Sequence, residues 1–113
     1  MDSVIRQKSF DFALAIIELY RKLQERHEYV ISRQLLRSGT SIGANVEEAT
    51  GQSRKDFLSK MAIASKEARE TKYWLLLLQK SRLADVDVTV HLSQVEELIR
   101  ILTSIVKTTS QRV

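Results

Sequence analysis

The 113-residue sequence contains no cysteine and no proline, and it has only three glycines and two histidines. Without cysteine, the chain can form neither a disulfide nor a thiolate zinc site. Without proline and with few glycines, it lacks the residues that interrupt helices and shape tight turns. The composition therefore predicts long helices, and the lack of cysteine fits a reducing, cytoplasmic location.

Long apolar segments and strong charge are missing as well. The longest apolar run, residues 73–78, is far shorter than the roughly 20 residues that cross a bilayer, and the charged N-terminus is unlike a signal peptide. We therefore expect a soluble protein with no membrane contact, and the length favours a single domain over residues 1–113. The net charge of +4 is small and scattered, so it favours an acidic partner only modestly.

Four segments, at about 3–26, 30–50, 54–81 and 88–106, have the apolar periodicity of amphipathic helices. Ser53 with Asp56 is expected to cap the third helix, and Asp87 the fourth. Because the connections are short, the predicted fold is all-α, an antiparallel up-down four-helix bundle. The expected core positions are Ile5, Phe12, Ile16, Leu19 and Leu23; Ile31, Leu35, Ser38, Ile42, Val46 and Ala49; Phe57, Met61, Ala64, Ala68, Thr71, Leu75 and Leu78; and Val88, Leu92, Val95, Ile99, Leu102 and Val106.

Two glycines, Gly39 and Gly43, interrupt the second of these segments. Each costs about 1 kcal/mol relative to alanine inside a helix. Their four-residue spacing resembles the small-residue motif of membrane helices, but the segment is too polar to span a bilayer. We therefore expect these glycines to permit close approach by a neighbouring helix.

The third segment has a second group of apolar residues, which is predicted to point away from the core. The group consists of Ile63, Tyr73, Trp74 and Leu77. Since a helix that is apolar on all sides is normally buried on all sides, this face predicts an interface with a second copy of the chain. The alternative is that Tyr73 and Trp74 are isolated surface aromatics, which are common.

Motifs for catalysis or metal binding are not found. A di-iron bundle needs Glu-x-x-His pairs, but Gln24 and Val88 precede His27 and His91 by three residues. Phosphate-binding glycine loops and nucleophile elbows do not occur either. We expect both histidines at the surface, no cofactor, no metal and no enzymatic activity.

A line of polar residues, Arg37, Ser41, Asn45 and Glu48, follows the second segment beside its apolar stripe. It can be a partly buried structural network or a functional site, and a solvent-filled pocket around it would favour an enzyme. Because buried polar groups need partners, we favour a network in which Glu67 or Glu70 of the third segment pairs with Arg37.

The same region resembles a bacterial family named for proteins encoded by intervening sequences in 23S rRNA genes. The resemblance is carried by residues 34–48, QLLRSGTSIGANVEE, and continues to about Leu83. The first and last segments match that family only in length and hydrophobic rhythm. The residues that carry the resemblance are Arg37, Ser41, Ile42, Asn45, Glu48, Phe57, Ala64, Glu67 and Glu70.

This resemblance implies an antiparallel four-helix bundle that assembles into a ring-like homopentamer without known enzymatic activity. A related branch contains accessory subunits of diversity-generating retroelements, which resemble basic pentameric barrels that bind nucleic acid and a reverse transcriptase. The present chain differs from that branch in its weak, dispersed positive charge. A ribosomal role does not follow from the family name, which records where some of the genes lie.

Two functional hypotheses follow. The first is a non-catalytic homo-oligomeric scaffold that binds RNA or DNA weakly, because a ring repeats each basic residue and salt-sensitive phosphate contacts add up. The alternative is a ring that docks a separately encoded enzyme, such as a reverse transcriptase, without touching nucleic acid. The candidate phosphate contacts, each of which is otherwise a solvated surface charge, are Lys22, Arg26, Arg54, Lys55 and Lys60.

Overall fold

The structure, a computed structural model, describes residues 3–111, so residues 1, 2, 112 and 113 of the predicted domain lie outside the described part. It contains the helices α1 (Ser3–Glu25), α2 (Ile31–Ala49), α3 (Arg54–Ser81) and α4 (Thr89–Gln111). Within residues 3–111 there is no strand, so the all-α prediction is confirmed. None of these four helices is long and apolar enough to cross a membrane.

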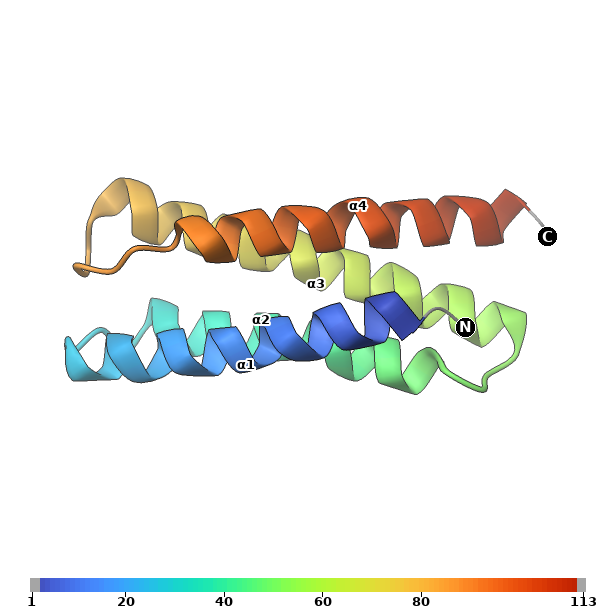
Figure 1. The fold of residues 1–113 in the computed structure, drawn as a ribbon, viewed down its shortest axis with the longest axis horizontal. Helices are drawn as coiled ribbons and strands as arrows, with labels where there is room; N and C mark the ends of the chain where they lie inside the picture. The colour runs from blue at the N-terminus through green and yellow to red at the C-terminus, as the bar shows by residue number, and fades with distance from the viewer. Residues whose placement is uncertain (1–2, 112–113) are drawn as a thin grey trace.

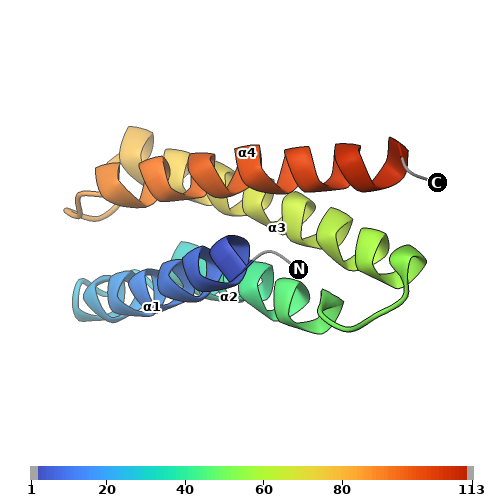
Figure 2. The ribbon, with the colours of Figure 1, turned by 45° about the vertical axis from the view of Figure 1, so that its right-hand side comes forward.

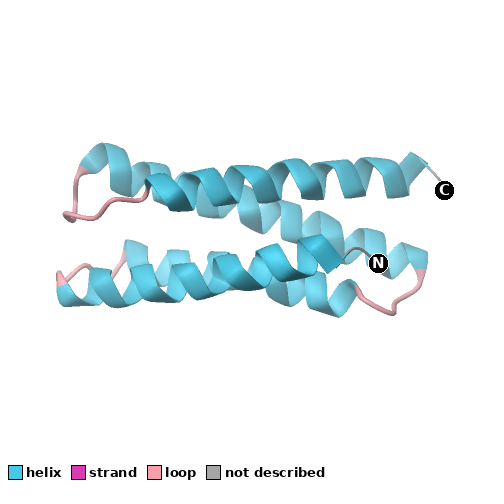
Figure 3. Cartoon of the chain, in the orientation of Figure 1, coloured by secondary structure: helices cyan, strands magenta, loops and turns pink. Residues whose placement is uncertain are grey.

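The helices run alternately in opposite directions along the long axis of the molecule (Figure 1). α1 and α2 lie side by side in one layer, and α3 and α4 form the other (Figure 2). The α1–α2 and α3–α4 connections lie at one end and the α2–α3 connection lies at the other (Figure 3). Each helix packs on the next, and the contact between α1 and α4 is the least extensive. The predicted antiparallel up-down bundle is therefore confirmed.

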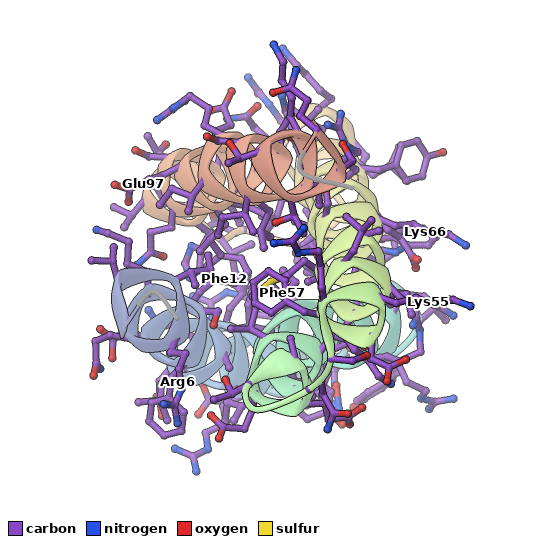
Figure 4. All side chains as sticks on the ribbon, turned by 90° about the vertical axis from the view of Figure 1, so that its right-hand side faces the viewer. Arg6, Phe12, Lys55, Phe57, Lys66 and Glu97 are labelled. Atoms are coloured by element: carbon purple, nitrogen blue, oxygen red, sulfur yellow. The ribbon has the colours of Figure 1, made fainter. Side chains whose placement is uncertain are left out.

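The core is one continuous group of apolar side chains from all four helices. Phe12 and Phe57 point into the centre of the bundle (Figure 4), with Phe12 fully buried and Phe57 half-buried. In α4 the buried stripe runs through Leu98, while Ile99 and Val106 are only partly buried. The predicted core positions that are buried are Ile5, Phe12, Ile16, Leu19, Leu23, Leu35, Ser38, Ile42, Val46, Ala49, Met61, Ala64, Ala68, Thr71, Leu75, Leu78, Val88, Leu92, Val95 and Leu102.

Side-chain oxygens cap the starts of α3 and α4, as the sequence predicts. The hydroxyl of Ser53 accepts a hydrogen bond from the backbone N–H of Asp56 at 3.2 Å. The carboxylate of Asp87 accepts hydrogen bonds from the backbone N–H and hydroxyl of Thr89 at 3.0 and 2.7 Å. These contacts satisfy amides that have no partner within the helix.

The start of α2 has a cap that the sequence analysis did not identify. The buried carboxylate of Glu28 accepts hydrogen bonds from the three backbone N–H groups of residues 30–32, at 3.1, 3.0 and 2.6 Å. The hydroxyl of Ser32 returns a hydrogen bond to the Glu28 carbonyl at 2.8 Å. A negative charge at the positive end of a helix is stabilising, so Glu28 fixes where α2 begins.

Both glycines of α2 lie against α1. A Cβ atom on Gly39 would lie 2.9 Å from Cγ1 of Ile16, and one on Gly43 would lie 3.3 Å from the carbonyl oxygen of Ser9. Gly43 therefore meets backbone and Gly39 meets a core side chain. The prediction that these glycines permit close helix packing is confirmed.

Candidate functional site

The predicted polar network joins α2 to α3. Nη1 of Arg37 donates to Oε1 of Glu67 at 3.1 Å, and Nη2 donates to the carboxylate of Glu70. Glu70 also accepts a hydrogen bond from the indole N–H of Trp74 at 3.0 Å. The hydrogen bonds from Arg37 and then Trp74 hold the pKa of Glu70 below its ordinary value. The expected pairing of Arg37 with Glu67 or Glu70 is confirmed, and both acids take part.

The remaining members of the polar line also form hydrogen bonds or ion pairs within the chain. The side-chain amide of Asn45 donates to the carbonyl of Ser41 at 2.9 Å and to its hydroxyl at 3.1 Å. Glu48 forms an ion pair with Lys60 of α3 at 2.8 Å. The charged groups that could have formed a reactive centre therefore bind each other across the α2–α3 contact.

The second apolar group of α3 is only partly where the sequence analysis placed it. Ile63 is 40% exposed and Tyr73 is 56% exposed, while Leu77 is half-buried. The prediction that Trp74 points away from the core is wrong, because its ring is half-buried and packs against core residues. Trp74 follows buried Thr71 by three residues, so it lies on the flank of the core face.

The outward side of α3 carries a regular stripe, which we call the α3 outer seam. Its members recur at alternating spacings of four and three residues, which places them along one side of the helix. The only acidic member, Glu70, is bound to Arg37, so the exposed charges of the seam are positive. The seam consists of Ser59, Ile63, Lys66, Glu70, Tyr73, Leu77 and Lys80.

A second apolar surface, which the sequence analysis missed, lies between α1 and α2. It is a groove of about 490 Å³ in which Phe10 and Leu14 are 61% and 50% exposed. A visible signal was the spacing of Phe10, Leu14 and Ile17, which repeats at four and three residues beside the core stripe. The α1–α2 groove is lined by Arg6, Phe10, Ala13, Leu14, Ile17, Thr40, Gly43, Ala44 and Glu47.

The five candidate phosphate contacts do not form one patch. Lys22 and Arg26 lie where α1 ends, whereas Arg54, Lys55 and Lys60 lie near the start of α3 at the other end of the molecule (Figure 1). Lys60 is bound to Glu48. α3 contains seven Lys and Arg against three Asp and Glu, so this helix alone carries +4, the same as the whole chain.

The two histidines differ in their surroundings. His27 is exposed, as predicted, and its Nδ1 lies 2.8 Å from the Tyr29 hydroxyl. The surface prediction is wrong for His91, which is half-buried where α4 faces α1. Burial lowers the pKa of His91, and a hydrogen bond to the Ala15 backbone partly opposes this shift.

His91 borders a surface depression of about 370 Å³ that has no serine or cysteine in its lining. The lining mixes acidic and basic side chains from the end of α1 and the α3–α4 connection. Across residues 3–111, no group of three or more His, Asp or Glu side chains could hold a metal ion. The residues that border the depression are Glu18, Leu19, Lys22, Glu25, Arg26, Asp85, Val86, Asp87 and His91.

Comparison with known proteins gives a family and a structural relative. The family described as 23S rRNA-intervening sequence protein matches residues 1–104. A crystal structure of a protein of unknown function from the S23 ribosomal protein family of Bacteroides thetaiotaomicron is 45% identical, with a TM-score of 0.82. The match covers 91% of this chain and 98% of that one. No curated protein matches the chain. The chain belongs to the family of 23S rRNA-intervening sequence proteins.

Proposed function

We propose that this protein is the subunit of a non-catalytic homo-oligomeric scaffold, with the homopentameric ring implied by the resemblance as its expected form. The observation that carries the proposal is the presence of two separate exposed apolar surfaces on one small bundle. Phe10 and Leu14 are exposed in the α1–α2 groove, and Ile63 and Tyr73 are exposed on α3. Exposed apolar clusters of this kind mark sites of protein–protein contact.

The absence of a catalytic role is supported by the state of the polar residues. Arg37 is bound to Glu67 and Glu70, and Glu48 is bound to Lys60, so these groups stabilise the α2–α3 contact. The family match likewise indicates no catalytic family.

Light scattering after size-exclusion chromatography tests the scaffold proposal. We expect a mass of several chains, about five for the ring, that stays constant over a wide range of protein concentration. A closed ring should show a discrete mass, since each subunit then has both of its surfaces covered. A single-chain mass at the highest attainable concentration would overturn the proposal.

Weak binding of RNA or DNA is a second candidate function, and the charge of α3 favours it. In a ring the exposed cations near the bundle ends, such as Lys22, Arg26 and Lys55, would recur once per subunit and add their phosphate contacts. We expect affinity for single- and double-stranded nucleic acids that falls steeply between low and moderate salt. A ring that binds neither nucleic acid at low salt would instead favour the docking of a protein partner.

A further inference from the structure

We propose that copies of this chain associate head to tail, with the α3 outer seam of one copy packed in the α1–α2 groove of the next. This inference rests on the proposed homo-oligomeric function and specifies the surfaces that build it. In the view along the bundle, Arg6 marks the α1–α2 side and Lys66 points away from α3 on a different side (Figure 4). Each copy can therefore contact two neighbours at once.

The shapes of the two surfaces are complementary. Thr40, Gly43 and Ala44 give the groove a floor of small side chains, beside which Phe10 and Leu14 stand exposed. The α3 outer seam is a ridge whose exposed apolar side chains, Ile63 and Tyr73, are ten residues apart. At 1.5 Å per residue this spacing is about 15 Å. The groove's lining on α1 runs from Arg6 to Ile17, which on the same scale is about 17 Å.

Charge argues against contact between two α3 outer seams. Lys66 and Lys80 lie on the seam. Of the acids, Glu70 is held by Arg37, and exposed Asp56, next to Lys55 at the start of the helix, is hydrogen-bonded to Ser53. Two such faces would bring lysines together without acids to offset them. The α1–α2 side of a second copy is a better match for the α3 outer seam than another seam is.

Exposed acids border that side. Glu47 lines the groove and Asp11 lies on α1 beside Leu14, and both carboxylates are accessible to a neighbouring chain. Arg6 donates hydrogen bonds of 3.0 Å to the Glu47 carboxylate and offsets its charge. Asp11 therefore contributes the unbalanced negative charge. Lysines of the approaching seam would thus meet carboxylates around an apolar centre, which is the arrangement that fixes the orientation of an interface.

Contact between two grooves would leave Ile63 and Tyr73 exposed. A head-to-tail contact covers both apolar surfaces with a single type of interface, and it generates a ring when the rotation between neighbours closes. Lateral packing of this kind also leaves both ends of each bundle free. The basic residues at those ends then remain available on the two rims of the ring.

Two single-surface variants test the arrangement. Phe10→Glu places a charge in the groove, and Tyr73→Glu places one on the seam. Because both side chains are exposed, each variant should keep the helical content and unfolding midpoint of the parent. Each variant alone should be a monomer, since its intact surface finds no intact counterpart. Val90→Glu on α4 is the matched control, because Val90 is 67% exposed and lies outside both surfaces.

Mixing the two variants gives the decisive result. The intact seam of the Phe10→Glu chain should enter the intact groove of the Tyr73→Glu chain, so sedimentation should detect a 1:1 heterodimer that grows no further. No heterodimer at high concentration would overturn the inference, as would assembly of either variant alone into the parental oligomer. A monomeric parent would instead overturn the proposed function itself, so the two failures are distinguishable.

Discussion

The guanidinium of Arg37 lies 3.1 Å from the carboxylate of Glu67 and connects α2 to α3 near the middle of the bundle. The Glu67 side chain is only 11% exposed, whereas that of Arg37 is 52% exposed. A nearly buried carboxylate depends on its partner more than an exposed cation does. The pair is therefore asymmetric, and removing the arginine should be more damaging than removing both charges.

Replacing Arg37 with Gln should lower the free energy of unfolding by about 1 kcal/mol, since the nearly buried Glu67 carboxylate then loses its charged partner. Half-exposure of the arginine keeps the loss near the low end of the usual range. Adding Glu67→Gln to that variant should recover part of the loss. Urea unfolding of the two single variants and the double variant measures the coupling. Strictly additive effects would contradict this account.

Replacing Glu28 with Ala should destabilise the protein by roughly 1–2 kcal/mol, because three backbone N–H groups at the start of α2 lose their acceptor. Glu28→Gln should cost less, since an amide oxygen still accepts hydrogen bonds but carries no charge. Exposed Glu25→Gln is the control and should be nearly neutral. Thermal unfolding checks all three, and equal melting temperatures for Glu28→Ala and the control would refute the capping role.

The Glu28 cap shows where prediction from the sequence reached its limit. Ser53 and Asp87 belong to residue types that commonly cap helices, so their roles were predictable. Glu28 is not such a type. It caps α2 because its longer side chain reaches the backbone N–H groups of residues 30–32 in the following turn. That conformation depends on the α1–α2 connection, which local pattern rules do not describe.

Side-chain direction was also predictable only in part. The 3.6-residue period predicted the core positions of α1 and α2. The need of buried polar groups for partners predicted that Glu67 or Glu70 would pair with Arg37. Trp74 was misplaced because it lies on the flank between core and solvent, where packing against the core cluster decides its burial. The α1–α2 groove was missed because its lining comes from two helices, and only their packing brings Phe10 next to Gly43.

Replacing Gly39 with Ala should destabilise the bundle despite the higher helix propensity of alanine. The new Cβ would lie 2.9 Å from Cγ1 and 3.0 Å from Cγ2 of Ile16. Overpacking of this kind costs about 1–3 kcal/mol, which exceeds the gain of about 1 kcal/mol in propensity. In an Ile16→Ala background, which removes both γ carbons, the same substitution should be neutral or stabilising. Chemical denaturation of the four proteins checks this reversal, and an equal cost in both backgrounds would rule out the steric explanation.

His91 should make the stability of the bundle depend on pH below about 6.5. Burial lowers the pKa of this imidazole in the folded chain below its ordinary value of 6.5, so the unfolded chain takes up a proton first as the pH falls. The contribution of neutral His91 is therefore fully present above that value and is lost progressively below it. Among the neighbouring charges, Lys22 lowers this pKa and Asp87 raises it.

Replacing His91 with Gln should therefore flatten the change in unfolding free energy between pH 7.5 and 5.5, whatever its effect on absolute stability. His27→Gln is the matched control, because it removes the other histidine of the chain at an exposed position. Urea unfolding at five pH values measures the slopes. A parental slope in His91→Gln would mean that the protonation of another group controls stability in this range.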